Sequence, residues 1–239
     1  MGPAHRRAVG GGRRAARGAA YPREEAAGTH RLNAKPIPVV VVHGLWLNGL
    51  EFFLLRERLA AAGFEASVFR YPSTQASLAD ATSALAARLR SFGGPVHILA
   101  HSLGGVVTLE TFATERELPP GRIVLLGSPV QGSRAAQAIA AWSWGPQILG
   151  SLAVAELARP RARSWNGPRE VGVIAGSRSA GLGRLFSSLP VPNDGTIAVD
   201  ETRLPGATAS TILDVSHTGM LFSLPVAESI TRFFRTGGF

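Results

Sequence analysis

Ser102 lies in the sequence PVHILAHSLGG, between an apolar run typical of a buried strand and a run typical of a helix. A serine on a tight strand-to-helix turn exposes its hydroxyl and can act as a nucleophile, provided that small residues flank it. Ala100 and Gly104 are the small residues here, and Ala100 replaces the more usual glycine. The alternative is a serine that only caps the helix, a position that serine favours. The motif alone does not decide between the two.

A nucleophilic hydroxyl needs a base, and His217 is our candidate. It lies in LDVSHTGMLFS, after the last predicted strand and before the last predicted helix. Imidazole is suited to accepting a proton and returning it near neutral pH. Other histidines are less suitable, because His97 lies inside a strand and His101 is the neighbour of Ser102, facing the opposite side of the strand.

A carboxylate that orients the base is expected in VPNDGTIAVDETR, which follows another predicted strand. Asp194 in this segment can accept a hydrogen bond from the second imidazole nitrogen of His217 and so fix its tautomer. Asp-Gly is also a routine turn sequence. Asp200 and Asp214 likewise lie between the serine and the histidine and remain alternatives for the acid.

The segment His43-Gly44-Leu45 ends the first strong strand and can supply a backbone N–H to a developing oxyanion. We expect the N–H groups of Leu45 and Leu103 to form the oxyanion hole. Such donors stabilise a tetrahedral intermediate more than a ground-state carbonyl. In another enzyme, the loss of one side-chain donor of an oxyanion hole raises the activation free energy by about 3 kcal/mol. An ordinary strand-ending turn is the alternative.

The elements that must position these residues alternate along the chain. Strands are predicted at residues 36–44, 64–72, 95–102, 122–129, 169–177 and 207–216, and helices at 49–62, 77–92, 103–115 and 218–235. Parallel neighbours need crossover connections, so this order predicts an α/β fold with a doubly wound, mostly parallel sheet. Reactive groups are then expected at the carboxyl ends of the strands.

The motifs together resemble bacterial lipases and esterases of the α/β-hydrolase superfamily over residues 36–235. VVVVHGL resembles their oxyanion segment, LAHSLGG their nucleophile turn, LLGSPVQGS the segment after the next strand, NDGT their acid loop and DVSHTGMLFS their histidine loop. The resemblance implies the α/β-hydrolase fold, whose chain order of serine, acid and histidine matches Ser102, Asp194 and His217. Besides Ala100, the departure is Val130-Gln131, where many relatives carry His-Arg.

Residues 131–168 interrupt the alternation with an Ala-rich, Trp-bearing helical insertion. Resemblance to lipases implies a lid-like role, whereas apolar stripes at helical spacing usually face a core. Trp46, beside the oxyanion segment, is the better candidate for touching substrate, followed by Trp142 and Trp144.

The chain has 239 residues, no cysteine and a formal net charge of +9. Residues 1–35 hold eight Arg or Lys and two Glu, so most of the positive charge belongs to this Gly-, Ala- and Arg-rich segment. We expect a disordered basic tail here and one hydrolase domain over residues 36–239. No secretory signal and no membrane-spanning run of apolar residues is evident, which predicts a soluble, cytoplasmic protein.

The predicted reaction is hydrolysis of a carboxylic ester through an acyl-serine, with no metal or cofactor. The expected substrate is a small-molecule or lipid ester with an apolar acyl group, and peripheral contact with lipid is compatible with it. Amidase, thioesterase or acyltransferase activity on the same triad is an alternative, as is a non-catalytic binding protein. Nucleic acid is not a predicted partner. A tail that binds nucleic acid or anionic lipid is the rival hypothesis.

Overall fold

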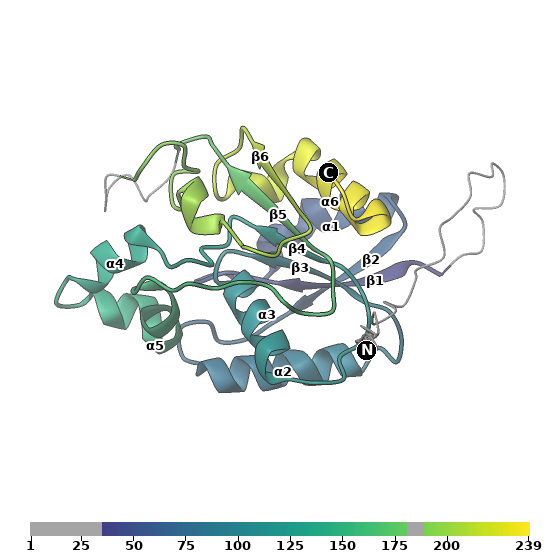
Figure 1. Cartoon of the computed structure of the whole chain (residues 1–239), viewed down its shortest axis with the longest axis horizontal. Helices are drawn as coiled ribbons and strands as arrows, with labels where there is room; N and C mark the ends of the chain where they lie inside the picture. Colours follow the sequence, from purple (N-terminus) through teal and green to yellow (C-terminus); the bar gives the residue numbers. More distant parts are fainter. Residues whose placement is uncertain (1–34, 181–188) are drawn as a thin grey trace, which may run out of the picture. The chain divides into compact units, whose positions relative to one another are not determined.

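The computed structural model describes residues 35–180 and 189–239 (Figure 1). Their centre is a six-stranded sheet in the order β2-β1-β3-β4-β5-β6, in which every pair of neighbours is parallel. The strands are β1 (Ile37–Val42), β2 (Phe64–Phe69), β3 (His97–His101), β4 (Ile123–Leu126), β5 (Val171–Gly176) and β6 (Ala209–Leu213). The predicted doubly wound, mostly parallel sheet is confirmed. The predicted basic tail, residues 1–35, lies almost entirely outside the described residues.

Helices cover both faces of the sheet. The helices α1 (Phe53–Ala61) and α6 (Leu224–Thr236) cover one face, and α2 (Leu78–Arg90) and α3 (Leu103–Thr114) cover the other (Figure 1). The valines of β1 are all inaccessible to solvent because alternate side chains enter the two cores: Val39 and Val41 pack beneath α1 and α6, and Val40 and Val42 beneath α2 and α3. Burial on both faces explains the continuous β-branched run.

The last helix begins later than the sequence prediction of 218–235. A short 3₁₀ helix, Gly219–Phe222, comes first, and α6 starts at Leu224. Ser223 caps α6 by accepting a hydrogen bond from the Val226 N–H (3.4 Å), and a proline stands in its first turn. Ser followed by Pro is a helix-start signal. The segment after His217 is therefore a separate loop and 3₁₀ turn.

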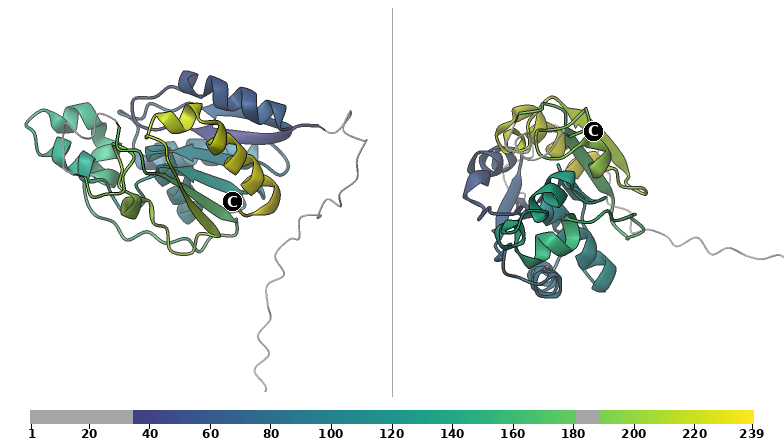
Figure 2. Two further views of the ribbon diagram at one scale, coloured as in Figure 1. Left: turned by 90° about the horizontal axis from the view of Figure 1, so that it is seen from above. Right: turned by 90° about the vertical axis from the view of Figure 1, so that its left-hand side faces the viewer.

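The insertion contains two helices, α4 (Arg134–Ala140) and α5 (Gly145–Leu157), placed beyond one end of the sheet (Figures 1 and 2). The helix α5 is kinked at Gly150, which has φ 77° and ψ 164°. A Cβ at Gly150 would lie 2.1 Å from the Thr74 carbonyl oxygen, so only glycine permits this close approach. Buried α5 residues join the core beneath α2 and α3: Leu149, Leu152, Ala153 and Leu157.

Two further short elements complete the description, the 3₁₀ helices Leu50–Phe52 before α1 and Val199–Thr202 after the acid loop. Within the described ranges, no helix has both the length and the apolar character needed to cross a lipid bilayer.

His97 is a structural residue of the sheet. Its ring stacks on Phe234 with 4.5 Å between ring centroids, and its Nδ1 accepts a hydrogen bond from the Arg122 N–H (2.9 Å). Burial, reinforced by Arg122 and Arg169, lowers the pKa of His97 to about 3. The imidazole therefore stays neutral throughout the pH range in which the protein would be assayed.

The neutral state of His97 predicts acid sensitivity of the fold. Between pH 6.5 and 3 the unfolded chain takes up a proton at this residue and the folded chain does not, so the free energy of unfolding falls as the pH falls. For His97 alone the loss between pH 7 and pH 5 is about 2 kcal/mol. We expect His97→Asn, whose side-chain oxygen can replace Nδ1 as acceptor, to be less stable at pH 7 but to have a flatter pH dependence. Urea unfolding at both pH values measures this, and equal pH dependence in the two proteins would refute it.

Candidate active site

Ser102 follows β3 directly and adopts φ 54° and ψ −125°, a left-handed backbone conformation that is unfavourable for a side chain with a Cβ. Its N–H donates to the Leu126 carbonyl (2.9 Å) at the end of β4. Although it stands in the cap position of α3, its hydroxyl makes no capping hydrogen bond. The structure therefore does not support the helix-cap interpretation.

Two glycines allow α3 to start close to the sheet. A Cβ at Gly104 would lie 2.4 Å from the Val42 carbonyl oxygen and 2.6 Å from that of His43. A Cβ at Gly105 would lie 2.1 Å from Ser128 Oγ. Neither contact is possible for a real side chain, so these positions require glycine, and the sharp turn at Ser102 follows from their close approach.

The departures from the common motif fit without distortion. Ala100 is fully buried, and its methyl group belongs to the core beneath α2 and α3. Val130 is buried in the same core, while the Gln131 side-chain N–H₂ donates to the carbonyls of Arg163 and Arg203, both at 2.8 Å. Gln131 thus holds two loops together.

His217 and Asp194 form a buried pair, with His217 Nδ1 2.7 Å from Asp194 Oδ2. The His217 N–H also donates to the Asp194 carbonyl (2.9 Å). The other carboxylate oxygen, Oδ1, accepts from the N–H groups of Thr196 (2.9 Å) and Ile197 (2.7 Å). Since a carboxylate only accepts, the proton of the neutral imidazole lies on Nδ1, and Nε2 keeps its lone pair for an incoming proton.

The alternative acids are engaged elsewhere. The Asp200 carboxylate forms a two-pronged ion pair with Arg134 (2.8 and 2.9 Å), which lowers the pKa of that carboxyl group. The exposed Asp214 carboxylate pairs with Arg178 (2.8 and 3.2 Å), which lowers its pKa likewise. Of the three aspartates considered, the structure brings Asp194 to His217.

Gly127, directly after β4, connects the two halves of the site. It has φ 51°, and a Cβ there would lie 3.0 Å from His217 Nδ1 and 3.1 Å from Asp194 Oδ2. The preceding residue, Leu126, is the hydrogen-bond partner of Ser102. Ser102 and the His217–Asp194 pair therefore border the same strand end. In the described part of the chain the Ser102 hydroxyl is not hydrogen-bonded to the imidazole, as is common without substrate.

The oxyanion segment lies against the nucleophile. A Cβ at Gly44 would lie 2.9 Å from Ser102 Cβ, so the backbone of Gly44 packs directly on the serine. Leu45 follows it half-buried, and Leu103 is the buried first residue of α3. The orientation of the Leu45 and Leu103 N–H groups toward an oxyanion stays a prediction.

Tyr71, which sequence reasoning missed, lies just past β2 and holds this segment. Its hydroxyl donates to the His43 carbonyl (3.1 Å), its ring stacks on the His43 ring at 4.6 Å, and its N–H donates to His43 Nε2 (3.4 Å). His43 Nδ1 therefore carries the proton and donates to the Gly44 carbonyl (2.9 Å). Burial lowers the pKa of His43 and keeps this arrangement neutral. The sequence signal that could have revealed this contact is an aromatic residue just past β2, the strand that pairs with β1.

His101, to which the sequence assigned no role, packs against the candidate base. Its ring centroid lies 4.7 Å from that of His217, and its Nε2 is 3.3 Å from the His217 carbonyl oxygen. Complete burial, together with the nearby His217, holds the pKa of His101 well below its ordinary value. A neutral ring thus supports the backbone of the histidine loop.

The tryptophans are placed differently from one another. Trp46 is exposed, has φ 60°, and donates from its indole Nε1 to the Ile148 carbonyl in α5 (2.9 Å). Trp142 and Trp144 contact each other with ring centroids 4.8 Å apart, in the connection between α4 and α5. The structure thus joins the oxyanion segment to the insertion through Trp46.

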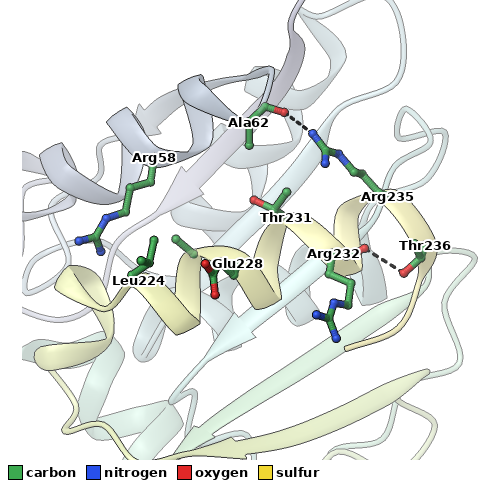
Figure 3. A pocket seen from close by; sticks show the side chains of 9 residues that line it. Arg58, Ala62, Leu224, Glu228, Thr231, Arg232, Arg235 and Thr236 are labelled. Atoms are coloured by element: carbon green, nitrogen blue, oxygen red, sulfur yellow. Dashed lines mark hydrogen bonds between the residues drawn. The ribbon is translucent and has the colours of Figure 1, made fainter. Parts of the chain in front are cut away.

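A groove of about 370 Å³ between α1 and α6 is a separate feature (Figure 3). Arg58 donates to the Phe222 carbonyl (2.8 Å), and Arg235 donates to the Ala62 carbonyl (2.7 Å). The first bond joins α1 to the 3₁₀ helix that precedes α6, and the second joins α6 to the end of α1. None of the candidate catalytic residues lines the groove.

Residues 39–228 match the model of the Alpha/beta hydrolase family, and the chain belongs to that family. The resemblance inferred from its motifs is thereby confirmed, and the protein is a hydrolase by class.

Several solved structures have folds similar to that of this chain. The mature lipase BlEst2 of Bacillus licheniformis is 21% identical, with a TM-score of 0.62 over 83% of this chain and 93% of that chain. Phospholipase PlaB from Legionella pneumophila is 14% identical, with a TM-score of 0.65 over 86% of this chain and 60% of that one. The pyrethroid hydrolase PytH is 13% identical, with a TM-score of 0.58 over 84% and 98%. These likenesses show the fold alone. No curated protein matches the chain in sequence.

The three aspartates give a matched test of the acid. We expect Asp194→Asn to lower kcat by about four orders of magnitude, because an amide stabilises the wrong imidazole tautomer. Asp200→Asn and Asp214→Asn remove only exposed ion pairs with arginine and should retain rates within about twofold of wild type. Steady-state hydrolysis of a p-nitrophenyl ester compares the three. A near-wild-type rate for Asp194→Asn would transfer the role to another residue.

Proposed function

We propose that the protein is a serine esterase that cleaves carboxylic esters through an acyl-serine intermediate. Ser102 is the nucleophile, His217 the general base and acid, and Asp194 the residue that orients the imidazole. The N–H groups of Leu45 and Leu103 form the oxyanion hole. The observation that carries the proposal is the buried His217–Asp194 hydrogen bond of 2.7 Å, bordering the same strand end as the strained turn at Ser102.

The reaction proceeds in two halves. His217 Nε2 takes the Ser102 proton while the serine oxygen attacks the ester carbonyl, and the two backbone donors bind the resulting oxyanion. Collapse of this tetrahedral intermediate breaks the bond to the alcohol, which leaves with the proton from His217. Water then attacks the acyl-serine with His217 again as base, which releases the acid and restores Ser102.

The surroundings of the site support an apolar substrate. Exposed apolar side chains follow the oxyanion segment at Trp46, Leu50 and Phe53, and another, Phe222, follows the histidine loop. Phe53 and Phe222 contact each other at 6.3 Å, which joins the two groups. Exposed apolar surface of this kind is suited to binding acyl chains or lipid. The lipase and phospholipase names of the similar structures agree with an ester substrate.

An active-site probe tests the nucleophile. A fluorophosphonate should label the wild-type protein but not Ser102→Ala, because the probe reacts with an activated serine hydroxyl. Ser91→Ala, which changes an exposed serine at the end of α2, is the matched control and should label like wild type. Equal labelling of wild type and Ser102→Ala would exclude Ser102 as the nucleophile.

The bond and acyl group are tested by a substrate series. We expect kcat/KM for p-nitrophenyl esters to rise from acetate to octanoate by about tenfold or more, because each buried CH₂ contributes about 0.8 kcal/mol and burial of two of the added methylene groups is sufficient for that increase. Matched anilides and thioesters in the same assay compare the bond types. Faster cleavage of the anilides, or a preference for acetate, would contradict the proposed substrate class.

A further inference from the structure

Trp46 has a backbone conformation that is unfavourable for a residue with a large side chain. Its φ of 60° is uncommon for any residue with a Cβ and unusual for one this bulky. Such a conformation persists only where surrounding contacts determine it. Trp46 is 56% exposed, so core packing is not the main restraint. Its indole N–H bond to the Ile148 carbonyl (2.9 Å) is the directional contact that fixes it.

The acceptor of this bond, the Ile148 carbonyl, lies next to the kink in α5. Gly150, two residues after Ile148, departs from helical geometry, and such a kink frees nearby carbonyls for donors outside the helix. The close approach of Gly150 to the Thr74 carbonyl and the burial of Leu149 fix the first half of α5 on the domain. The Ile148 carbonyl is therefore a fixed point from which Trp46 can be positioned.

The two anchors of the oxyanion segment enclose only two residues. Tyr71 holds the His43 carbonyl at one end, and α5 holds Trp46 at the other. Gly44 and Leu45 lie between them, with Gly44 packed on Ser102. The backbone that carries the Leu45 N–H is thus anchored on one side by Tyr71 and on the other side by the insertion.

We propose that Trp46 is a positioning residue whose hydrogen bond to α5 sets the Leu45 N–H for the oxyanion, so that the rate of the chemical step depends on the position of α5. This inference rests on the proposed function. A correctly placed oxyanion donor acts mainly in the transition state, so loss of the bond should reduce kcat and leave KM nearly unchanged.

Trp46→Phe removes the indole N–H and retains an aromatic ring. We expect kcat for a p-nitrophenyl ester to fall about three- to tenfold, the range that one hydrogen bond supports. KM should change by less than about twofold, since the ring remains available to substrate. The Tm should change by no more than about 2 °C, because the side chain is largely exposed.

Trp165→Phe is the matched control. Trp165 also donates its indole N–H to a backbone carbonyl, that of Arg169 at 2.8 Å, but it is buried and has no place in the oxyanion segment. This variant should lower the Tm and leave kcat and KM at wild-type values. Wild-type kinetics in Trp46→Phe would refute the inference, as would a fall in kcat that Trp165→Phe reproduces.

A double-mutant cycle tests the link to α5 itself. Gly150→Ala places a Cβ against the Thr74 carbonyl and should displace the Ile148 carbonyl, lowering kcat on its own. If the hydrogen bond is the link, Trp46→Phe adds little further loss to Gly150→Ala, whereas independent effects multiply. Multiplied losses would contradict the coupling. Should Gly150→Ala not fold, the kinetics of Trp46→Phe and Trp165→Phe decide the matter.

The wild-type protein separates this inference from the proposed function. If it neither hydrolyses esters nor reacts with the fluorophosphonate at Ser102, the proposed function fails, and the inference fails with it. If wild type is labelled and hydrolyses esters while Trp46→Phe does so equally well, only the role of Trp46 is refuted.

Discussion

The close approach of the first turn of α3 to the ends of β1 and β4 is the constraint on which the site depends. Gly104 lies against the carbonyls of Val42 and His43 at the end of β1, and Gly105 lies against Ser128 beyond β4. A helix that begins so near the sheet leaves no room for a gradual turn, so Ser102 must take a left-handed conformation. Unfavourable backbone geometry at this residue is compensated by the packing of the whole α3 face, whose first turns are buried.

The same approach organises the segments around the serine. Gly44 packs on Ser102 from one side, and Gly127 meets the His217–Asp194 pair at the neighbouring strand end. Glycine-containing turns at the carboxyl ends of β1, β3 and β4 therefore allow backbone segments to pack closely where side chains would not fit. The buried imidazoles of His43 and His101 pack beside these turns. Desolvation lowers their pKa values and keeps them neutral, so they donate hydrogen bonds without adding charge beside His217.

The sequence predicted the elements well because their signals are local. Short runs rich in apolar or β-branched residues predicted all six strands of the sheet, and the serine turn carries its small residues within two positions. Local residues also signal the late start of α6, namely Ser223 and the proline that follows Leu224. The apolar character of residues 218–222 nevertheless favoured an earlier start of the helix. Within the described residues, the predicted helices 49–62 and 218–235 both began too early, because a short 3₁₀ helix precedes each α-helix.

The site was harder to predict where contacts join distant segments. Asp200 and Asp214 resembled Asp194 until their ion pairs with Arg134 and Arg178 were seen. Tyr71 meets His43 across 28 positions, and Trp46 meets Ile148 across 102. No spacing rule reveals such partners, because they depend on strand order and on where the insertion folds back.

The wide separation of the His217–Asp194 pair from Ser102 along the chain has a consequence for biosynthesis. The serine turn lies in the first half of the sequence, whereas acid and base both follow β5. During synthesis the N-terminal part of a chain leaves the ribosome first, so Ser102 emerges before Asp194 and His217. In the proposed mechanism the serine therefore has no base until the segment that carries His217 has been made and has folded against it.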